Sequence, residues 1–267
     1  MKKILLITLN FLAGVWFTGL ASAAIFQVNL TVQDHVDDNP GDGVCDIPTG
    51  GFCTLRAAIM EANALPGPDI IILQGNTTIQ LTRTGANENA SATGDLDITG
   101  SVAIGTFIED TADYPTVQAN FNDDRVFDVR TNNNELVQFL RFKITNGSSN
   151  ANGGAINIGP GEQVEVDRVW FEDNNAVSGG AIYVSATSIL DVNDSVFVGN
   201  AAASQGGALT TFGKTSIDKS SIYENLNFNA GFQEALYAGY TNLGEDGLTV
   251  RNSTLFNNSE TGVFSVA

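Results

Sequence analysis

Carboxylate side chains are the most numerous groups in this chain that could do chemistry. The sequence has 30 acidic residues against 12 basic ones and one histidine, and its formal net charge is −18. Asp167, Asp194 and Asp218 fall on neighbouring positions of the repeat described below, and a glycoside hydrolase needs two carboxyl groups at a set separation. On so acidic a chain such a coincidence is expected. We therefore favour a non-enzymatic function and keep a polysaccharide lyase or glycoside hydrolase as the alternative.

Basic residues are too few and too scattered to favour a lyase, which needs a base near the sugar C5 and a group that neutralises the uronate carboxylate. The nearest approaches to a cluster are Arg141 with Lys143 and Lys214 with Lys219. The sequence also offers no basic patch that could neutralise phosphates, so we expect no nucleic-acid partner. Like-charge repulsion argues against binding to anionic lipid surfaces.

An acidic loop over residues 37–46, with the sequence DDNPGDGVCD, could bind a cation. Asp38, Asp42 and Asp46 provide oxygen ligands, and a glycine follows Asp42. The loop lacks the bidentate glutamate that ends an EF-hand loop. A solvated turn is the preferred interpretation, calcium at these three aspartates is the alternative, and we expect no other cofactor.

The N-terminus has the features of an export signal. Lys2 and Lys3 precede an apolar run over residues 4–20, and Ala21-Ser22-Ala23 forms a small-x-small cleavage pattern. We predict a cleaved signal peptide over residues 1–23 rather than a membrane anchor. The protein is then secreted or displayed on the outer surface of a bacterium, without inserting the mature segment into a membrane.

Two cysteines, Cys45 and Cys53, lie eight residues apart. Because the periplasm and the cell exterior are oxidising, an exported chain favours a disulfide between them over two free thiols. His35, the single histidine, has no obvious cysteine partner for catalysis.

Internal repeats indicate the elements that position these residues. The sequence GGAI at 153–156 recurs as GGAI at 179–182 and as GGAL at 206–209, at spacings of 26 and 27 residues. A second pattern, Phe-x-x-Asn, occurs in the same phase. Its copies are Phe171 with Asn174, Phe197 with Asn200 and, in degraded form, Ile222 with Asn225 and Leu255 with Asn258. Two patterns in one phase indicate a solenoid.

Each period contains three short runs of alternating apolar residues, clearest at 181–184, 189–192 and 195–198, separated by turn residues. Aligned copies give columns of like side chains, as parallel coils about 4.8 Å apart require. The sequence therefore predicts an all-β fold, a right-handed parallel β-helix with three-strand coils of about 26 residues. The asparagine column is interpreted as a hydrogen-bonded ladder at a turn rather than a ligand site.

Several segments resemble a known family. CTLRAAIMEAN, residues 53–63, resembles the CSLREA signature of bacterial β-helix proteins, and residues 94–104 and 123–129 are similar to the segments that follow it. The GGAI and Phe-x-x-Asn patterns resemble the repeats of chlamydial polymorphic outer-membrane proteins. The chain departs from the signature at Ala57, where the family has glutamate, so any ion pair from that position is lost. The resemblance implies an exported surface or extracellular β-helix.

The segment over residues 24–69 is predicted to form an N-terminal cap on the β-helix. Thr54 is a plausible N-cap of a short helix whose one face carries Leu55, Ala58, Ile59 and Ala62, and two prolines stop it. A cap is needed because an open β-helix end exposes strand edges. The β-helix is predicted over residues 70–267, with its C-terminal end covered by further sequence or by another chain.

One outward column could bind sugars. Two residues beyond each repeat alanine lie Asn157, Tyr183, Thr210 and Tyr237. Aromatic faces stack on sugar rings, although ordinary surface tyrosines on a β face are the preferred interpretation of the column. We expect an exported non-enzymatic module for adhesion, display or carbohydrate binding, with a polysaccharide or a cell-surface glycan as its partner.

Overall fold

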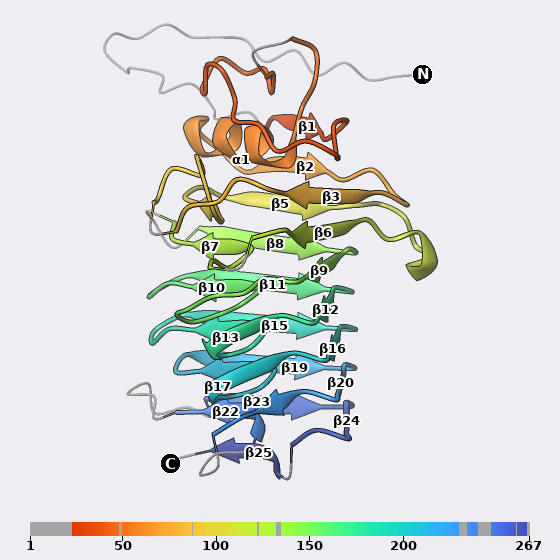
Figure 1. The fold of residues 1–267 in the computed structure, drawn as a ribbon, viewed down its shortest axis with the longest axis vertical. Coiled ribbons are helices and arrows are strands. Elements are labelled where there is room, and N and C mark those ends of the chain that lie inside the picture. Colours follow the sequence, from red (N-terminus) through yellow and green to blue (C-terminus); the bar gives the residue numbers. More distant parts are fainter. Residues whose placement is uncertain are drawn as a thin grey trace, which may run out of the picture.

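The computed structural model describes residues 23–47, 50–86, 88–121, 123–131, 135–229, 234–239 and 247–259, and the backbone of residues 261–265. Its strands stack in parallel coils below an N-terminal cap (Figure 1). The architecture confirms the predicted all-β right-handed parallel β-helix with one short helix. The predicted signal peptide, residues 1–23, lies outside the described residues except for Ala23.

Three parallel sheets form the walls of the solenoid. Sheet 1 is eight-stranded: β1 (Ile25–Gln27), β2 (Asp69–Ile72), β5 (Val102–Gly105), β8 (Leu136–Leu140), β11 (Gln163–Asp167), β15 (Ile189–Asn193), β19 (Lys214–Asp218) and β23 (Leu248–Arg251). Sheet 2 comprises β4 (Leu96–Ile98), β7 (Phe127–Val129), β10 (Ile156–Ile158), β14 (Ile182–Val184), β18 (Leu209–Thr211), β22 (Glu234–Ala238) and β25 (Thr261–Ser265). Sheet 3 comprises β3 (Thr78–Leu81), β6 (Thr116–Ala119), β9 (Lys143–Thr145), β12 (Trp170–Glu172), β16 (Val196–Val198), β20 (Ser221–Tyr223) and β24 (Thr254–Phe256).

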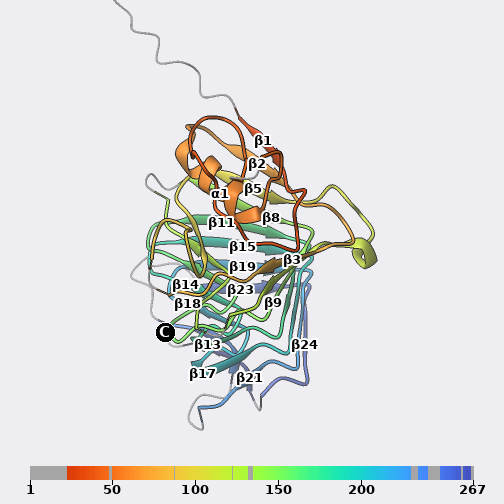
Figure 2. The same ribbon diagram turned by 45° about the horizontal axis from the view of Figure 1, so that its top comes forward.

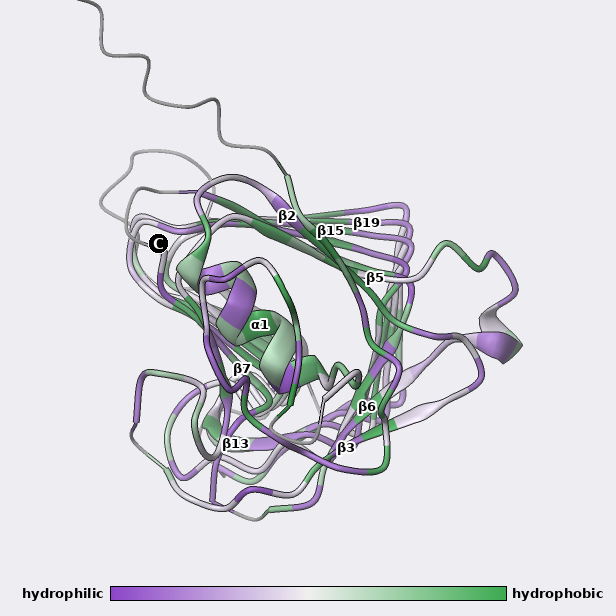
Figure 3. Ribbon diagram, turned by 90° about the horizontal axis from the view of Figure 1, so that it is seen from above, coloured by the Kyte–Doolittle hydropathy of each residue, from purple (hydrophilic) through white to green (hydrophobic). Residues whose placement is uncertain are grey.

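The strand registers confirm the predicted columns. Val166 pairs with Val192, which pairs with Ile217. The Phe-x-x-Asn phenylalanines and the GGAI isoleucines align in the same way on sheets 3 and 2. These side chains are fully buried in one continuous core, whereas alternate residues such as Glu165 face outward. Looking down the axis, Figure 3 shows the walls of successive coils superimposed.

A fourth strand in three of the coils departs from the three-strand prediction. β13 (Asn175–Ser178), β17 (Ala201–Gln205) and β21 (Leu226–Asn227) form a small parallel sheet, which we call the corner sheet. It lies between sheet 3 and the Gly-Gly pairs. Gly179 has φ +64°, and a Cβ on Gly180 would collide with the backbone oxygens of Gly207 and Ala201. The repeated glycines therefore let neighbouring coils approach closely at this corner.

The asparagine column is a buried ladder, as predicted. Asn174 donates from its side-chain amide to Oδ1 of Asn200 at 3.0 Å, Asn200 donates to Asn225 at 2.9 Å, and Asn225 donates to Asn258 at 3.0 Å. Each of these Oδ1 atoms also accepts the backbone N–H of the preceding ladder residue. The side chains thus continue the hydrogen-bonding pattern of the sheets through a turn.

The N-terminal cap covers the first coil with the helix α1 (Leu55–Ala64), which Figures 2 and 3 show lying across the end of the solenoid. Thr54 is its N-cap, as predicted, and accepts the N–H of Ala57. The cap also supplies β1, which pairs with β2 and extends sheet 1. A 3₁₀ turn, η1 (Thr111–Asp113), lies in the extended loop between β5 and β6.

The predicted disulfide between Cys45 and Cys53 is present and ties the acidic loop to the residue before the N-cap. In the described part of the chain, no helix has both the length and the apolar character needed to cross a membrane.

Candidate functional site

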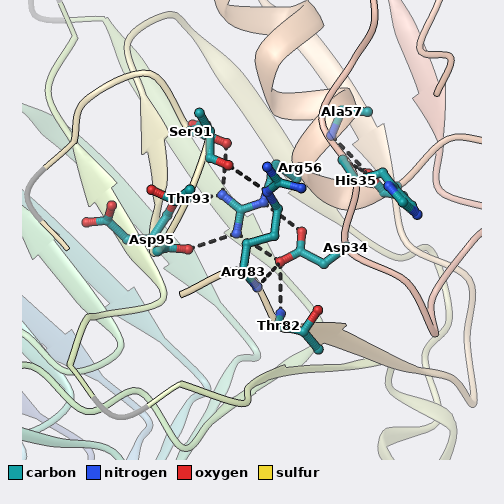
Figure 4. Close-up of polar contacts among 12 residues, drawn as sticks. Asp34, His35, Arg56, Ala57, Thr82, Arg83, Ser91, Thr93 and Asp95 are labelled. Atoms are coloured by element: carbon teal, nitrogen blue, oxygen red, sulfur yellow. Dashed lines mark hydrogen bonds and ion pairs between the residues drawn. The ribbon is translucent and has the colours of Figure 1, made fainter. Parts of the chain in front are cut away.

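The cap contains a buried arginine that organises the first coil. Arg56 is fully buried and forms a bidentate ion pair with Asp34, at 2.6 Å from Nε and 3.1 Å from Nη2 (Figure 4). Its remaining N–H groups donate to the backbone oxygens of Ser91, Gly94 and Asp95 at 2.8–3.1 Å. Only the planar five-donor fork of arginine suits such an arrangement. Arg56 therefore fixes the loop over residues 91–95 against the cap.

That loop carries a group of carboxylates onto sheet 2. Asp95 ends the loop, Asp97 lies on β4 and Asp128 lies opposite Asp97 on β7. All three are buried, and one ligand atom from each lies within 4.8 Å of the others. Asp124 is buried beside them and accepts the N–H of Asp95 at 3.2 Å. We call Asp95, Asp97, Asp124 and Asp128 the carboxylate cluster.

Two arginines partly neutralise the carboxylate cluster. Arg125 Nη1 lies 2.7 Å from Asp128 Oδ2 and 3.8 Å from Asp95 Oδ2, and Arg130 Nη2 lies 2.6 Å from Asp128 Oδ2. Asn157 donates to the other oxygen of Asp128 at 2.8 Å. Both oxygens of Asp128 thus accept from donors, whereas the Asp95 carboxylate has only the distant guanidinium.

The pKa values of the cluster reflect this imbalance. Burial, reinforced by the negative charges of Asp124 and Asp97, raises the pKa of Asp95 to about 8. Burial also raises the pKa of Asp97 to about 6, against the opposing hydrogen bond from the N–H of Ser91. The pKa of Asp124 is raised by burial as well. Strongly shifted carboxyl groups at one place are a mark of functional sites, although buried ion networks produce them too.

A pocket of about 330 Å³ lies next to the carboxylate cluster. It is lined by Asp124 and Arg125 from the cluster side and by Ser149, Asn150 and Ala151 from the following coil, together with Ala86 and Asp123. Solvent can therefore reach the edge of the cluster. The carboxylates of Asp95 and Asp97 themselves are almost completely covered.

The column predicted to bind sugars continues the line of Asp97 and Asp128 along sheet 2. Asn157, Tyr183, Thr210 and Tyr237 occupy successive strands in register. Their exposure does not match a flat binding face: Thr210 is fully buried and Tyr237 is 8% exposed. Phe212 packs between the two tyrosines, with ring centroids 5.9 and 6.0 Å from theirs. A sugar-binding role for the column stays a prediction, and the accessible surface for it is confined to Asn157 and Tyr183.

A groove of about 540 Å³ runs over the outer face of sheet 1. Polar side chains from four coils line it: Gln138, Glu165, Asp167, Asp191, Asn193, Asp194, Ser216 and Lys219, with Leu140 and Val166 between them. Glu165 accepts a hydrogen bond from Gln138 at 2.7 Å and faces Asp191 on the next strand. Burial, together with the negative charge of Glu165, raises the pKa of Asp191.

Of the three aspartates considered for hydrolysis, two line this groove and the third does not. Asp167 and Asp194 line the groove, whereas Asp218 lies one coil further on and bonds to Asn252 at 2.7 Å. Asp167 aligns with Asn193 and then Asp218, so Asp194 is not in their column. The adjacent pair of carboxylates in the groove is instead Glu165 and Asp191. The alternation of inward and outward side chains along the strands could have identified this pair.

The acidic loop does not gather its aspartates around one point. Within the described residues, the only group of carboxylates close enough to share a cation is Asp95, Asp97 and Asp128, so the alternative of calcium at Asp38, Asp42 and Asp46 is not supported. Asp42 accepts hydrogen bonds from Asn39 and Val44 within the loop. The preferred interpretation, a turn, therefore agrees with the structure.

Comparisons with known proteins found no matching family model, no matching curated protein and no matching solved structure. The function must therefore be argued from the fold and the sites above.

Proposed function

We propose that this chain is an exported, non-enzymatic surface or extracellular module of a bacterium, and that it binds a polysaccharide or a cell-surface glycan. The N-terminal pattern of basic, apolar and small residues supports export, and the disulfide is in keeping with an oxidising location. The resemblance of residues 53–63 to the CSLREA signature, and of the repeats to those of polymorphic outer-membrane proteins, supports display on a surface.

The groove on sheet 1 carries the binding proposal. Gln138, Asn193 and Ser216 offer amide and hydroxyl groups, and the carboxylates accept hydrogen bonds from sugar hydroxyls. These side chains stand on strands held by continuous parallel ladders, so the surface is rigid before a ligand arrives and loses little conformational entropy on binding. A linear polymer can lie across several coils and use the same type of contact repeatedly.

The test compares polysaccharide retention by wild-type protein and by amide variants on a glycan array. Asp191→Asn and Glu165→Gln keep the shape of the groove and remove carboxylate acceptors, so we expect each to weaken retention by about tenfold. Glu172→Gln on sheet 3 makes the same chemical change outside the groove and should leave retention unchanged. If the three amide variants retained the polysaccharide as well as wild type and only Tyr183→Ala lost retention, the binding site would lie on the sheet 2 column instead.

An enzymatic alternative is favoured by one observation, the pairing of Glu165 with Asp191. Two neighbouring carboxyl groups, of which one has a raised pKa, are the arrangement that acid–base hydrolysis of glycosides uses. Release of reducing ends, and the absorbance of an unsaturated uronate product in the presence of calcium, distinguish hydrolysis and elimination from binding. Turnover by wild type that Asp191→Asn abolishes would replace the binding proposal.

A further inference from the structure

The carboxylate cluster gathers four buried aspartates at one place and has few counter-charges. Four aspartates are buried here, and of their two arginine partners Arg130 has a side chain that is 52% exposed. Buried ionised carboxylates are costly unless they are paired or coordinate a metal. Asp34 shows how the same protein satisfies one buried carboxylate, with a bidentate arginine and the N–H groups of Thr82 and Arg83.

A single carboxylate oxygen shows where the cluster lacks a positively charged or hydrogen-bonding partner. Asp95 is 3% exposed, and its Oδ1 is buried without a hydrogen-bond partner among the described residues. The other oxygen of Asp95 lies 3.8 Å from Arg125 Nη1, beyond hydrogen-bond distance. Native proteins rarely leave such an atom unsatisfied, and an ion is one of the ordinary explanations.

The geometry points to a divalent cation held by Asp95, Asp97 and Asp128, and we propose that this ion is calcium. One oxygen from each side chain lies within 4.8 Å of the others. Two oxygens that both contact one Ca²⁺ at about 2.4 Å can be at most about 4.8 Å apart, and each pair among the three side chains meets this limit. Both guanidinium groups contact Oδ2 of Asp128, so Oδ1, which accepts one hydrogen bond from Asn157, keeps its second lone pair for the cation.

Calcium suits the site better than magnesium. Magnesium requires nearly ideal octahedral geometry at shorter distances, whereas calcium accepts irregular sets of carboxylate, carbonyl and water oxygens. The three aspartates come from a loop and from two strands, and nothing constrains them to octahedral angles. The adjoining pocket, lined by Asp124 and Arg125, brings solvent to the edge of the cluster.

The position of the ion gives it a structural role. Asp95 belongs to the loop that Arg56 holds against the cap, and Asp97 and Asp128 belong to the first two strands of sheet 2. A cation at this point would fasten the cap to the first coils in addition to the Arg56 network. Its removal should therefore loosen the N-terminal end before the repeats that follow.

The experiment uses the full chain after treatment with a chelator and its removal by dialysis. Isothermal titration with CaCl₂ near pH 7.5 should show one bound ion per chain, and the melting temperature should rise until the site is saturated. Asp95→Asn keeps the shape and should weaken calcium binding at least about tenfold, with Asp128→Asn as a second variant in case the first folds poorly. Circular dichroism verifies that each variant is folded.

Asp42→Asn in the acidic loop is the matched control, because it removes one carboxylate that is not part of the cluster and should leave calcium binding unchanged. Two results would overturn the proposal. One is the absence of calcium binding and of any thermal shift in folded wild-type protein, which would mean that a proton neutralises Asp95. The other is binding that survives in Asp95→Asn and Asp128→Asn and is lost in Asp42→Asn.

Discussion

The asparagine ladder allows a quantitative test through the substitution Asn200→Ala. Asn200 is fully buried and takes part in four side-chain hydrogen bonds: it accepts from the N–H and from the amide of Asn174, and donates to Phe171 O and to Asn225 Oδ1. Alanine removes all four. The backbone N–H of Asn174 then has no acceptor, and it lies where water cannot easily replace it.

The expected cost follows from those bonds. A hydrogen bond in a folded protein contributes about 1 kcal/mol net, and a buried donor left unpaired costs about 1–3 kcal/mol. Asn200→Ala should therefore lower the free energy of unfolding by about 4 kcal/mol. Asn258→Ala, at the partly exposed end of the ladder, should cost about half as much, because Asn258 makes three such bonds and water can replace some of them.

Equilibrium unfolding in urea, followed by far-ultraviolet circular dichroism, measures these changes. Asn193→Ala, an exposed asparagine on the same coil, serves as the matched control and should change stability by less than about 0.5 kcal/mol. Hydrogen exchange adds a local readout, since the amide of Asn174 should lose protection in Asn200→Ala. If Asn200→Ala were no more destabilising than Asn193→Ala, the ladder would not contribute to stability as argued.

Three further outcomes are expected. Arg56→Met should lower the free energy of unfolding by about 3–5 kcal/mol, measured by urea titration, because it leaves a buried carboxylate without its arginine; a loss below about 1 kcal/mol would contradict the role given to Arg56. Reduction of the bridge between Cys45 and Cys53 should cost about 2.5 kcal/mol by loop-closure entropy, seen as a lower melting temperature with dithiothreitol, and an unchanged melting temperature would argue against it. Burial raises the pKa of Glu162 above its ordinary 4.5, so its contribution to stability is fully present below pH 4.5 and is lost as the pH rises through the raised pKa. Glu162→Gln should remove that part of the pH dependence of the melting temperature, and identical profiles would refute it.

The repeats made most of the fold predictable. Side chains one period apart occupy equivalent places in a solenoid, so the amino-acid sequence alone places Val166, Val192 and Ile217 in one column, and the strand registers agree. The strands expected at 181–184, 189–192 and 195–198 are β14, β15 and β16 within one or two residues at each end. The corner sheet was missed, because Asn175–Ser178 is a short segment beside glycines, in which two apolar residues stand side by side instead of alternating with polar ones.

The carboxylate cluster was harder to predict for a different reason. Asp95, Asp97 and Asp128 belong to the first coils, where the GGAI pattern is absent and loops of unequal length hide the period. A usable signal does exist: Leu96–Ile98, Phe127–Val129 and Ile156–Ile158 each place a polar residue between two apolar ones, and they align in register. Extending the column of Asn157 towards the N-terminus would have brought two of the aspartates together.

The burial of Thr210 and Tyr237 could not be predicted from alternation along the strands. Alternation assigns Tyr183, Thr210 and Tyr237 correctly to the outer side of sheet 2. Whether an outward side chain meets solvent depends on neighbours outside the strand, and here Phe212 follows β18 and packs against both rings. Such contacts arise from turns, whose paths the repeat does not determine.

Parallel coils also give the molecule a direction of mechanical weakness. The backbone hydrogen bonds between coils run along the long axis of Figure 1, perpendicular to the strands. A force applied along that axis therefore loads these hydrogen bonds one coil after another. Each coil of 26 residues releases about 90 Å of chain when it separates from the next. Under tension the regular repeats should extend in uniform steps, while the cap, held by Arg56 across several segments, should resist as a single unit.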